Sequence, residues 1–223
     1  MEQEKKVAGE AAVDYVESGM VVGLGTGSTA YYAILELGRR VRDGIKIQAI
    51  PTSEHTRKLA ESENIPMIDF SKTIKIDLTI DGADEVDPQL NMIKGGGGAL
   101  LREKIIASAS TEMIVIADSS KNVPCLGQFP LPVEVTPFGW QTVVPQIEAL
   151  GARAVLREKN GETFVTDNHM YILDCHFGEI NDPVVMEVEI NDIPGVVING
   201  LFVGLATRLL VGQGSSVKTI ERE

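Results

Sequence analysis

The sequence has few of the side chains that build metal and redox centres: among its 223 residues are two cysteines, three histidines and one tryptophan. Cys125 and Cys175 show no CxxC spacing, so we expect free thiols in a reducing compartment and no disulfide. The histidines form no HxxxH or HExxH pair, which argues against a zinc site built by the protein. These residue types therefore predict neither a metal nor a redox cofactor.

The chain is also poor in positive charge, with 20 lysines and arginines against 32 acids and a formal net charge of −12. An acidic surface repels nucleic acid, and a phosphate ligand would need a local pocket. No apolar run reaches the roughly 18 residues that span a bilayer. The N-terminal stretch "MEQEKKVAGEAAVDYV" lacks the apolar core of a signal peptide. We therefore expect a cytoplasmic protein without nucleic-acid or membrane partners.

What the sequence does contain, in its first half, is a regular alternation of apolar strands and amphipathic helices. Strands are expected at 20–25, 45–50, 74–80 and 112–118, and helices at 4–17, 29–42, 52–65 and 99–110. This order is typical of right-handed βαβ units. It predicts an α/β fold with an open, mostly parallel, Rossmann-like sheet that carries helices on both faces.

The pattern changes near Gly127, where short strands that pair locally replace the alternation. Strands are expected at 129–137, 152–158, 163–167, 170–175, 196–202 and 206–212, with helices at 139–150 and 182–195. We expect a smaller α+β domain at 129–204. It would be inserted into a catalytic α/β domain formed by 1–128 and 205–223.

Four loops each follow a predicted parallel strand, and ligands of open α/β sheets bind at these carboxyl ends. The first loop, "GLGTGST", precedes a helix, where backbone N–H groups and the helix dipole favour an anion. It is no P-loop, because no lysine follows the glycines. As a dinucleotide fingerprint it is poor, because Ser28 stands where a third glycine belongs. A tight turn with a helix N-cap remains the alternative.

The second loop, "DGADEVD", crowds acids behind an apolar strand. Asp81 and Asp84 are the candidates for general acid–base chemistry, since neighbouring carboxylates have perturbed proton affinities. Two alternatives stay open: a Mg²⁺ site and a plain acidic turn. We expect Glu85 and Asp87 to be solvated.

The third loop, "KGGGGALLREK", places Lys94 beside four glycines whose bare N–H groups suit an oxyanion. Glu103 follows on the next helix and can serve the same pocket. By itself "REK" is typical of a solvated helical face. Because it follows the four glycines so closely, we favour a functional role for Glu103. In the fourth loop, "ADSSK", Lys121 is either a substrate ligand or a surface lysine.

Proton abstraction beside a carbonyl requires three things that these loops offer: a carboxylate base, a lysine and amides that stabilise an oxyanion, and a site that binds the phosphate. The intermediate would be an enediolate. This chemistry needs no metal, thiol or nicotinamide.

The motifs "GLGTGST", "DGADEVD", "KGGGGALLREKI", "ADSSK", "FPLPVEV" and "VKTI" resemble those of type A ribose-5-phosphate isomerases, in order, from about Lys5 to Ile220. The resemblance implies metal-free interconversion of D-ribose 5-phosphate and D-ribulose 5-phosphate in the non-oxidative pentose phosphate pathway. It also implies a homodimer or homotetramer. Gly98 stands where the family often has another residue, so this fourth glycine is expected to vary without consequence.

The resemblance assigns the catalytic roles to Glu103 as base, to Asp81 and Asp84 as acids, and to Lys94 as the oxyanion lysine. Substrate-binding positions fall on Lys5, Thr26, Gly27, Ser28, Thr29, Gly82, Ala83, Gly95, Gly96, Gly97 and Lys121. Within this set, Ser28 and Thr29 would bind the phosphate.

Two alternatives from other classes remain. One is a non-catalytic sugar-phosphate sensor, as some regulators with related α/β folds are. A sensor would not need Glu103, Asp81 or Lys94, and this chain has no helix-turn-helix extension. The other is a CoA transferase or an amino-sugar-phosphate deaminase.

Overall fold

The computed structural model describes residues 1–222, which divide into two compact units. Unit 1 contains Met1–Ala83, Arg102–Asn122 and the chain from Leu205 onward, and unit 2 contains Asp84–Leu101 and Val123–Gly204. The division differs from the expected domains, because 84–101 and 123–128 belong to unit 2. Strand pairing explains the difference: β5 (Met92–Ile93) pairs with β4 (Glu85–Val86) on one side and with β13 (Leu201–Phe202) on the other.

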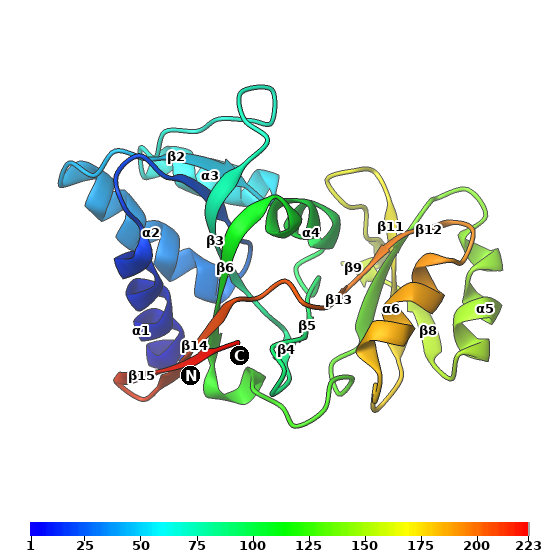
Figure 1. The fold of residues 1–223 in the computed structure, drawn as a ribbon. Helices are drawn as coiled ribbons and strands as arrows, with labels where there is room; N and C mark the ends of the chain where they lie inside the picture. The colour runs from blue at the N-terminus through cyan, green and yellow to red at the C-terminus, as the bar shows by residue number, and fades with distance from the viewer. Residues whose placement is uncertain (223) are drawn as a thin grey trace. The chain divides into compact units, whose positions relative to one another are not determined.

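Unit 1 is built on a six-stranded sheet with the order β15-β14-β6-β3-β1-β2. The strands are β1 (Val21–Leu24), β2 (Gln48–Pro51), β3 (Ile76–Gly82), β6 (Ser110–Asp118), β14 (Arg208–Gln213) and β15 (Ser216–Glu221). All neighbours pair in parallel except β14 and β15, which form an antiparallel hairpin (Figure 1). The prediction of a mostly parallel α/β sheet is therefore confirmed, whereas the closing strand β15 was not predicted. Pro51 is the last residue of β2, which is an edge strand. Because proline has no N–H, an edge strand is where it can stand without losing a hydrogen bond between strands.

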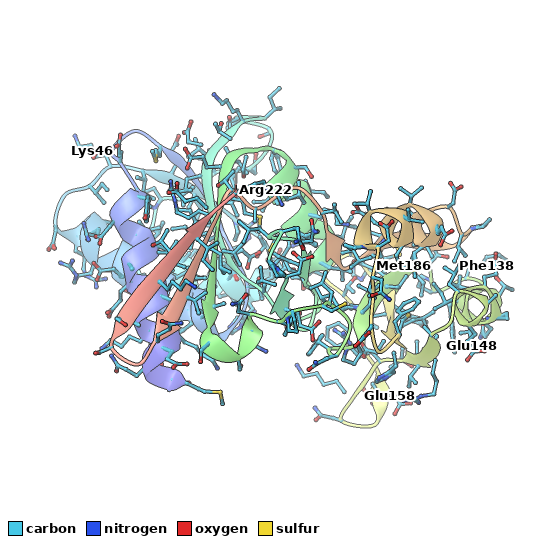
Figure 2. The ribbon with its side chains drawn as sticks, turned by 60° about the horizontal axis from the view of Figure 1, so that its bottom comes forward. Lys46, Phe138, Glu148, Glu158, Met186 and Arg222 are labelled. Carbon is cyan, nitrogen blue, oxygen red and sulfur yellow. The ribbon has the colours of Figure 1, made fainter. Side chains whose placement is uncertain are left out.

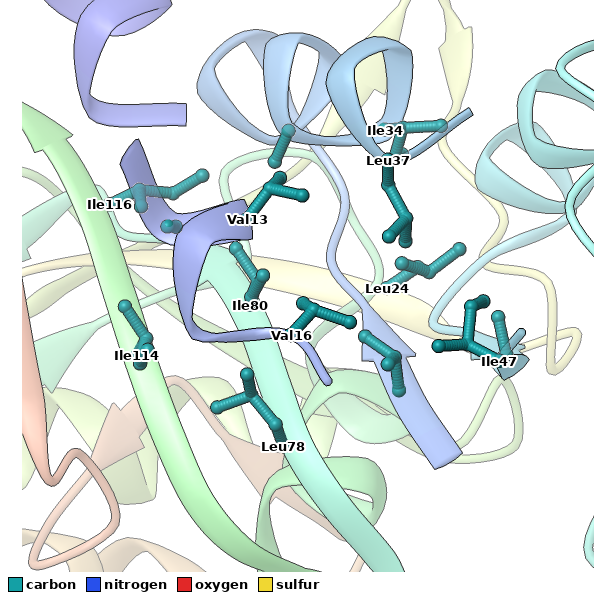
Figure 3. Packing of buried hydrophobic residues seen from close by; sticks show 14 of the residues in the cluster. Val13, Val16, Leu24, Ile34, Leu37, Ile47, Leu78, Ile80, Ile114 and Ile116 are labelled. Atoms are coloured by element: carbon teal, nitrogen blue, oxygen red, sulfur yellow. The ribbon is translucent and has the colours of Figure 1, made fainter. Parts of the chain in front are cut away.

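The helices of unit 1 cover the sheet on both faces. They are α1 (Glu2–Ala12), η1 (Val13–Tyr15), α2 (Ser28–Arg42), α3 (Glu54–Ser62) and α4 (Leu100–Ser108), whose last seven residues belong to unit 1. Figure 3 shows Val13 of η1 beside Ile80 of β3 and Ile116 of β6, and the side chains of α2 pointing towards Leu24 of β1. On the other face, a Cβ at Gly23 would lie 2.7 Å from Ile106 of α4. Each buried aliphatic side chain contributes about 1.5–3 kcal/mol.

Unit 2 is built on an antiparallel sheet with the order β12-β7-β11-β8. The strands are β7 (Leu131–Val135), β8 (Arg153–Leu156), β11 (Tyr171–His176) and β12 (Val196–Asn199), beside η3 (Trp140–Thr142), α5 (Val144–Ala149) and α6 (Pro183–Asn191). A small hairpin of β9 (Glu158–Lys159) and β10 (Glu162–Thr163) projects from the unit, at the Glu158 label in Figure 2. Cys125 and Cys175 are free thiols, and burial raises the pKa of Cys175.

Three expected elements of unit 2 differ from the structure. The strand expected at 196–202 is interrupted at Gly200, where β12 ends and β13 joins another sheet; a Cβ there would lie 2.3 Å from the carbonyl oxygen of Lys94. The strand expected at 163–167 is reduced to Glu162–Thr163, and the helix expected at 139–150 is divided into η3 and α5. Among residues 1–222 no helix has both the length and the apolar character to cross a membrane.

Candidate active site

The first glycine loop connects β1 to α2 through Gly25, Thr26 and Gly27. Gly27 has φ +128°, a conformation that side-chain-bearing residues avoid. The Thr26 hydroxyl oxygen lies 2.7–3.0 Å from the hydroxyl oxygens of Thr52, Ser53 and Thr56. This hydroxyl cluster was not predicted. Ser53 also caps α3, because its hydroxyl oxygen accepts from the Thr56 amide. The cluster fixes the loop, so the Thr26 side chain serves structure at this position.

Asp81 lies next to that loop, near the end of β3. Its Oδ1 accepts hydrogen bonds from the amides of Thr26 (3.1 Å) and Gly82 (2.7 Å), and its side chain is fully buried. A Cβ on Gly25 would lie only 2.0 Å from the same oxygen, so the second glycine of "GLGTG" makes room for the carboxylate. A buried carboxylate that is oriented by amides is consistent with a role in proton transfer, and it is not the solvated side chain of a plain acidic turn.

Helix α2 begins at Ser28 without a side-chain cap and without an acid in its first turn. Its first amides therefore point outward at the positive end of the helix dipole, which favours an anion there. Ser28 is exposed and Thr29 is 9% exposed. Helix α1 packs against this turn, since a Cβ on Gly9 would lie 3.0 Å from the Thr29 carbonyl oxygen. Lys5 lies one turn earlier on α1, on the same face as Gly9.

Glu103 is on α4, and it is not part of a solvated face. Its side chain is 3% exposed, although glutamate is rarely buried without a function or a partner. Lys104 is also buried, at 9% exposure, and Arg102 makes an ion pair with Glu54 at 2.8 Å. The alternative of a solvated charged face is therefore wrong for Glu103 and Lys104, and the functional role of Glu103 stays a prediction.

Lys121 ends η2 (Ser119–Lys121), the short turn after β6. Asp118 accepts from the amide of Ser120 at 3.0 Å, and Glu4 of α1 accepts from the Ser119 hydroxyl at 3.0 Å. Hydrogen bonds to Glu4 from the Gly214 amide and from Ser119 lower the pKa of Glu4. The turn that carries Lys121 is thus fixed by two carboxylates.

In unit 2, Asp84 contacts the tetraglycine loop directly. Its Oδ2 accepts a hydrogen bond from the Gly96 amide at 2.8 Å, and its own amide donates to Ile93 O. A Cβ on Gly96 would lie 2.6 Å from Asp84 Oδ1. The glycine is therefore required for the carboxylate to reach the loop.

Lys94 is 2% exposed, which is unusual for lysine. Its amide donates to Gly200 O at 2.9 Å, and its Nζ lies 5.5 Å from the centre of the Phe202 ring. A buried ammonium beside a run of backbone amides is a strong local positive charge in a protein whose overall charge is negative.

The conformation of the tetraglycine loop depends on its first and last members. Gly95 has φ +100° and Gly98 has φ +82°, and the Gly98 amide donates to Gly95 O at 2.9 Å. A Cβ on Gly98 would lie 2.4 Å from Cζ of Phe164. The structure argues against the expectation that Gly98 varies without consequence, because both its φ and the position of the Phe164 ring disfavour a side chain.

Glu85 and Asp87 were expected to be solvated, and this is also wrong. Glu85 is 4% exposed and accepts from the amides of Gly127 (2.7 Å) and Phe129 (2.6 Å). Asp87 is 6% exposed and accepts from the Gln89 and Asn91 amides. Both carboxylates fix loops of unit 2. The partners of Glu85 lie far away along the chain, so no local pattern indicates them, whereas Asp87 accepts from amides of its own turn.

The sequence analysis also missed Arg157, which lies just after β8. Its guanidinium donates to Gly95 O at 2.8 Å and pairs with Asp174. No motif marks this arginine, since its partners lie far away along the chain.

A mostly parallel α/β sheet that has a buried carboxylate, Asp81, near a strand end, beside the uncapped amides of a helix, defines the class: an α/β protein of the kind that binds ligands at the carboxyl ends of its strands. The chain belongs to the ribose 5-phosphate isomerase A (phosphoriboisomerase A) family, whose model matches residues 48–216.

Named relatives agree over nearly the full length. The chain is 51% identical to a ribose-5-phosphate isomerase A of Gloeobacter violaceus, covering 97% of this chain and 95% of the relative. Among solved structures, a ribose 5-phosphate isomerase from Plasmodium falciparum has a TM-score of 0.96, 38% identity and full coverage of both chains. A D-ribose-5-phosphate isomerase in complex with phospho-erythronic acid has a TM-score of 0.95 and 42% identity, covering 98% of this chain and 97% of its own.

Proposed function

We propose that this protein is a ribose-5-phosphate isomerase, which interconverts D-ribose 5-phosphate and D-ribulose 5-phosphate through an enediolate. The observation that carries the proposal is the pair of buried charged side chains on either side of the tetraglycine loop. Lys94 precedes the glycines at 2% exposure, and Glu103 follows them on α4 at 3% exposure. A base and an electrophile held at low exposure are what proton abstraction beside a carbonyl requires.

The reaction assigns Glu103 as the general base. With the sugar open, Glu103 removes the proton from C2, and the C2–H electrons form the C1–C2 double bond. The carbonyl oxygen O1 becomes an oxyanion, which Lys94 and the amides of Gly95 and Gly97 stabilise, while the Gly96 amide of the same loop donates to Asp84. A proton then moves from O2 to O1, and Glu103 returns its proton to C1 to give the ketose.

We assign the proton transfers at the sugar oxygens to the two aspartates. Asp81 and Asp84 assist ring opening, which needs a proton removed from one oxygen and given to another, and they move the proton between O2 and O1. Their amide partners favour the role: Thr26 and Gly82 orient Asp81, and Gly96 orients Asp84. Each carboxylate keeps one defined orientation while it exchanges a proton.

The remaining predicted residues hold the substrate. We assign the phosphate to the first turn of α2, with the amides and hydroxyls of Ser28 and Thr29, the backbone of Thr26 and Gly27, and a contribution from Lys5 on the neighbouring helix. Lys121 and the backbone of Gly82 and Ala83 contact the sugar. A phosphate at this helix terminus is bound against the negative field of the whole chain by local donors.

The test is isomerisation of ribose 5-phosphate by the purified protein after dialysis against EDTA, followed as ribulose 5-phosphate formed. Full activity establishes the reaction without a metal. Activity that returns only with Mg²⁺ keeps the isomerase and makes Asp81 or Asp84 a metal ligand. Binding of ribose 5-phosphate without turnover contradicts the proposal and favours a sensor.

We also propose that the protein forms a homodimer or a homotetramer and that it acts in the cytoplasm. Light scattering of the purified protein at micromolar concentration measures the assembly. A mass of one chain, 24.1 kDa, would contradict it.

A further inference from the structure

Arg157 connects the antiparallel sheet of unit 2 to the tetraglycine loop. Its Nη1 donates to Gly95 O at 2.8 Å and to Gly96 O at 3.2 Å. Its Nε and Nη2 bind the two carboxylate oxygens of Asp174, on β11, at 2.9 and 2.5 Å. Because the arginine side chain is only 13% exposed, these charge-assisted hydrogen bonds are weakly screened by solvent.

Phe164 adds a third contact to the same loop. The Arg157 guanidinium lies 5.8 Å from the centre of the Phe164 ring. The same ring occupies the space beside Gly98, where a Cβ would lie 2.4 Å from Cζ. Arg157 and Phe164 therefore contact the loop at Gly95, Gly96 and Gly98, and Asp174 holds the arginine in place.

The contacts with the carbonyl oxygens decide where the amides of the loop point. In a trans peptide the C=O and N–H are antiparallel, so binding Gly95 O fixes the amide of Gly96, and binding Gly96 O fixes the amide of Gly97. The Gly96 amide donates to Asp84. A cation on the carbonyl side also polarises the peptide and strengthens its N–H as a donor.

We propose that Arg157 is a positioning residue for the isomerisation, held by Asp174 and Phe164. It fixes the peptide planes of Gly95–Gly96 and Gly96–Gly97, and through them the oxyanion-binding amides and the carboxylate of Asp84. The inference rests on the proposed function, since it assigns Arg157 to the same oxyanion loop. A planar guanidinium can bind a carboxylate with one edge and carbonyl oxygens with another, whereas a lysine ammonium cannot.

The first test is steady-state isomerisation by Arg157→Met, Arg157→Lys and Asp174→Asn. The matched control is Arg153→Met, because Arg153 is an exposed arginine at the start of β8, the strand that directly precedes Arg157. Loss of one oxyanion-hole donor costs about 10²–10³ in kcat, so a misplaced donor in Arg157→Met should cost about 10–100-fold. KM should stay within about threefold. Arg157→Lys and Asp174→Asn should lose less, and Arg153→Met should match the wild type.

A second readout separates positioning from general damage. Phospho-erythronic acid carries a planar carboxylate, which imitates the enediolate oxygens, whereas inorganic phosphate occupies only the phosphate position. In Arg157→Met, inhibition by phospho-erythronic acid should weaken by about the same factor as kcat/KM. Inhibition by inorganic phosphate should be unchanged.

Two results would overturn the positioning role: a kcat for Arg157→Met equal to that of Arg153→Met, or an equal loss of inhibition by both anions. If Arg157→Met does not fold, as judged by thermal unfolding, Asp174→Asn decides by the same two readouts, because it keeps the shape of the side chain. An inactive wild type would instead contradict the proposed function. An active wild type with an unaffected Arg157→Met contradicts only this inference.

Discussion

The two glycine-rich loops look alike in sequence, but the structure holds them in different ways. The loop before α2 is fixed mainly by neutral hydroxyls, those of Thr52, Ser53 and Thr56, which surround Thr26, together with one carboxylate, Asp81, on the Thr26 amide. The tetraglycine loop is fixed by charges, with Asp84 on an amide and Arg157 on the carbonyls. The difference fits the tasks proposed for them: the first would present helix amides to a phosphate whose charge is constant, and the second would bind an oxygen whose charge develops during the reaction.

The comparison predicts that changes at the two loops affect different kinetic parameters. Changes around the second loop should lower kcat, because they act on the transition state, while changes at the first loop should raise KM.

The largest effect is expected for Glu103→Gln. General acid–base groups contribute about 10²–10⁴-fold, so kcat should fall by about that factor once the proton acceptor is lost. Inhibition by inorganic phosphate should persist, because the anchor is intact. Glu61→Gln, an exposed position on α3, is the matched control. Near-full activity of Glu103→Gln would mean that another base acts.

Gly98→Ala should damage both stability and turnover. The φ of +82° and the contact with Phe164 together should cost about 1–3 kcal/mol of unfolding free energy, and kcat should fall about tenfold or more as the loop shifts. Gly151→Ala is the control, since Gly151 has φ +101° with open space around it and reports the backbone strain alone. Urea unfolding and steady-state kinetics measure the pair. Equal effects at both positions would show that Phe164 does not constrain the loop.

The double variant Ser28→Ala with Thr29→Ala should raise KM by about tenfold and lower kcat less, since each lost hydrogen bond costs about 0.5–1.5 kcal/mol net and the backbone amides remain. Ser62→Ala, exposed on α3, controls for the loss of a hydroxyl. A fall in kcat larger than the rise in KM would show that the contacts with the phosphate stabilise the transition state more than the bound substrate. It would contradict the prediction that the first loop affects KM and the second loop affects kcat.

The smallest effect is expected at the far end of α2. Hydrogen bonds from Arg39 first, and then from Arg40, lower the pKa of Glu36 to about 2. Because the folded pKa lies below the unfolded value of about 4.3, the stabilisation is complete above that value and is lost as the pH falls towards 2. Glu36→Gln should lower Tm by a few degrees at pH 7 and by almost nothing near pH 2, with kinetics unchanged. A Tm difference that is independent of pH would contradict the ion-pair explanation.

The sequence predicted the parts of the molecule in which local pattern and packing agree. The alternation of apolar strands and helices led to the parallel sheet of unit 1, because strands buried on both faces have continuous apolar runs. The motif loops drew attention to Asp81, Asp84, Lys94 and Glu103, and the structure places these side chains at low or intermediate exposure. Their catalytic roles remain predictions.

Errors occurred where a residue's role depends on distant partners. Glu85 looks solvated in "DGADEVD", but the amides of Gly127 and Phe129 bury it. Gly98 looks dispensable until Phe164 is placed beside it. The strand expected at 196–202 reads as one apolar run, and only the close approach of the Lys94 carbonyl oxygen to Gly200 explains its division.

The sequence alone therefore determined the fold class and the catalytic motifs, because βαβ alternation and glycine-rich loops are local patterns with local physical causes. Only the tertiary structure decided which groups hold those loops. Arg157 and Asp174 carry no motif, and they act because the register of β8 and β11 brings them together beside the glycine carbonyls. Strand register is a long-range property, and no short stretch of sequence states it.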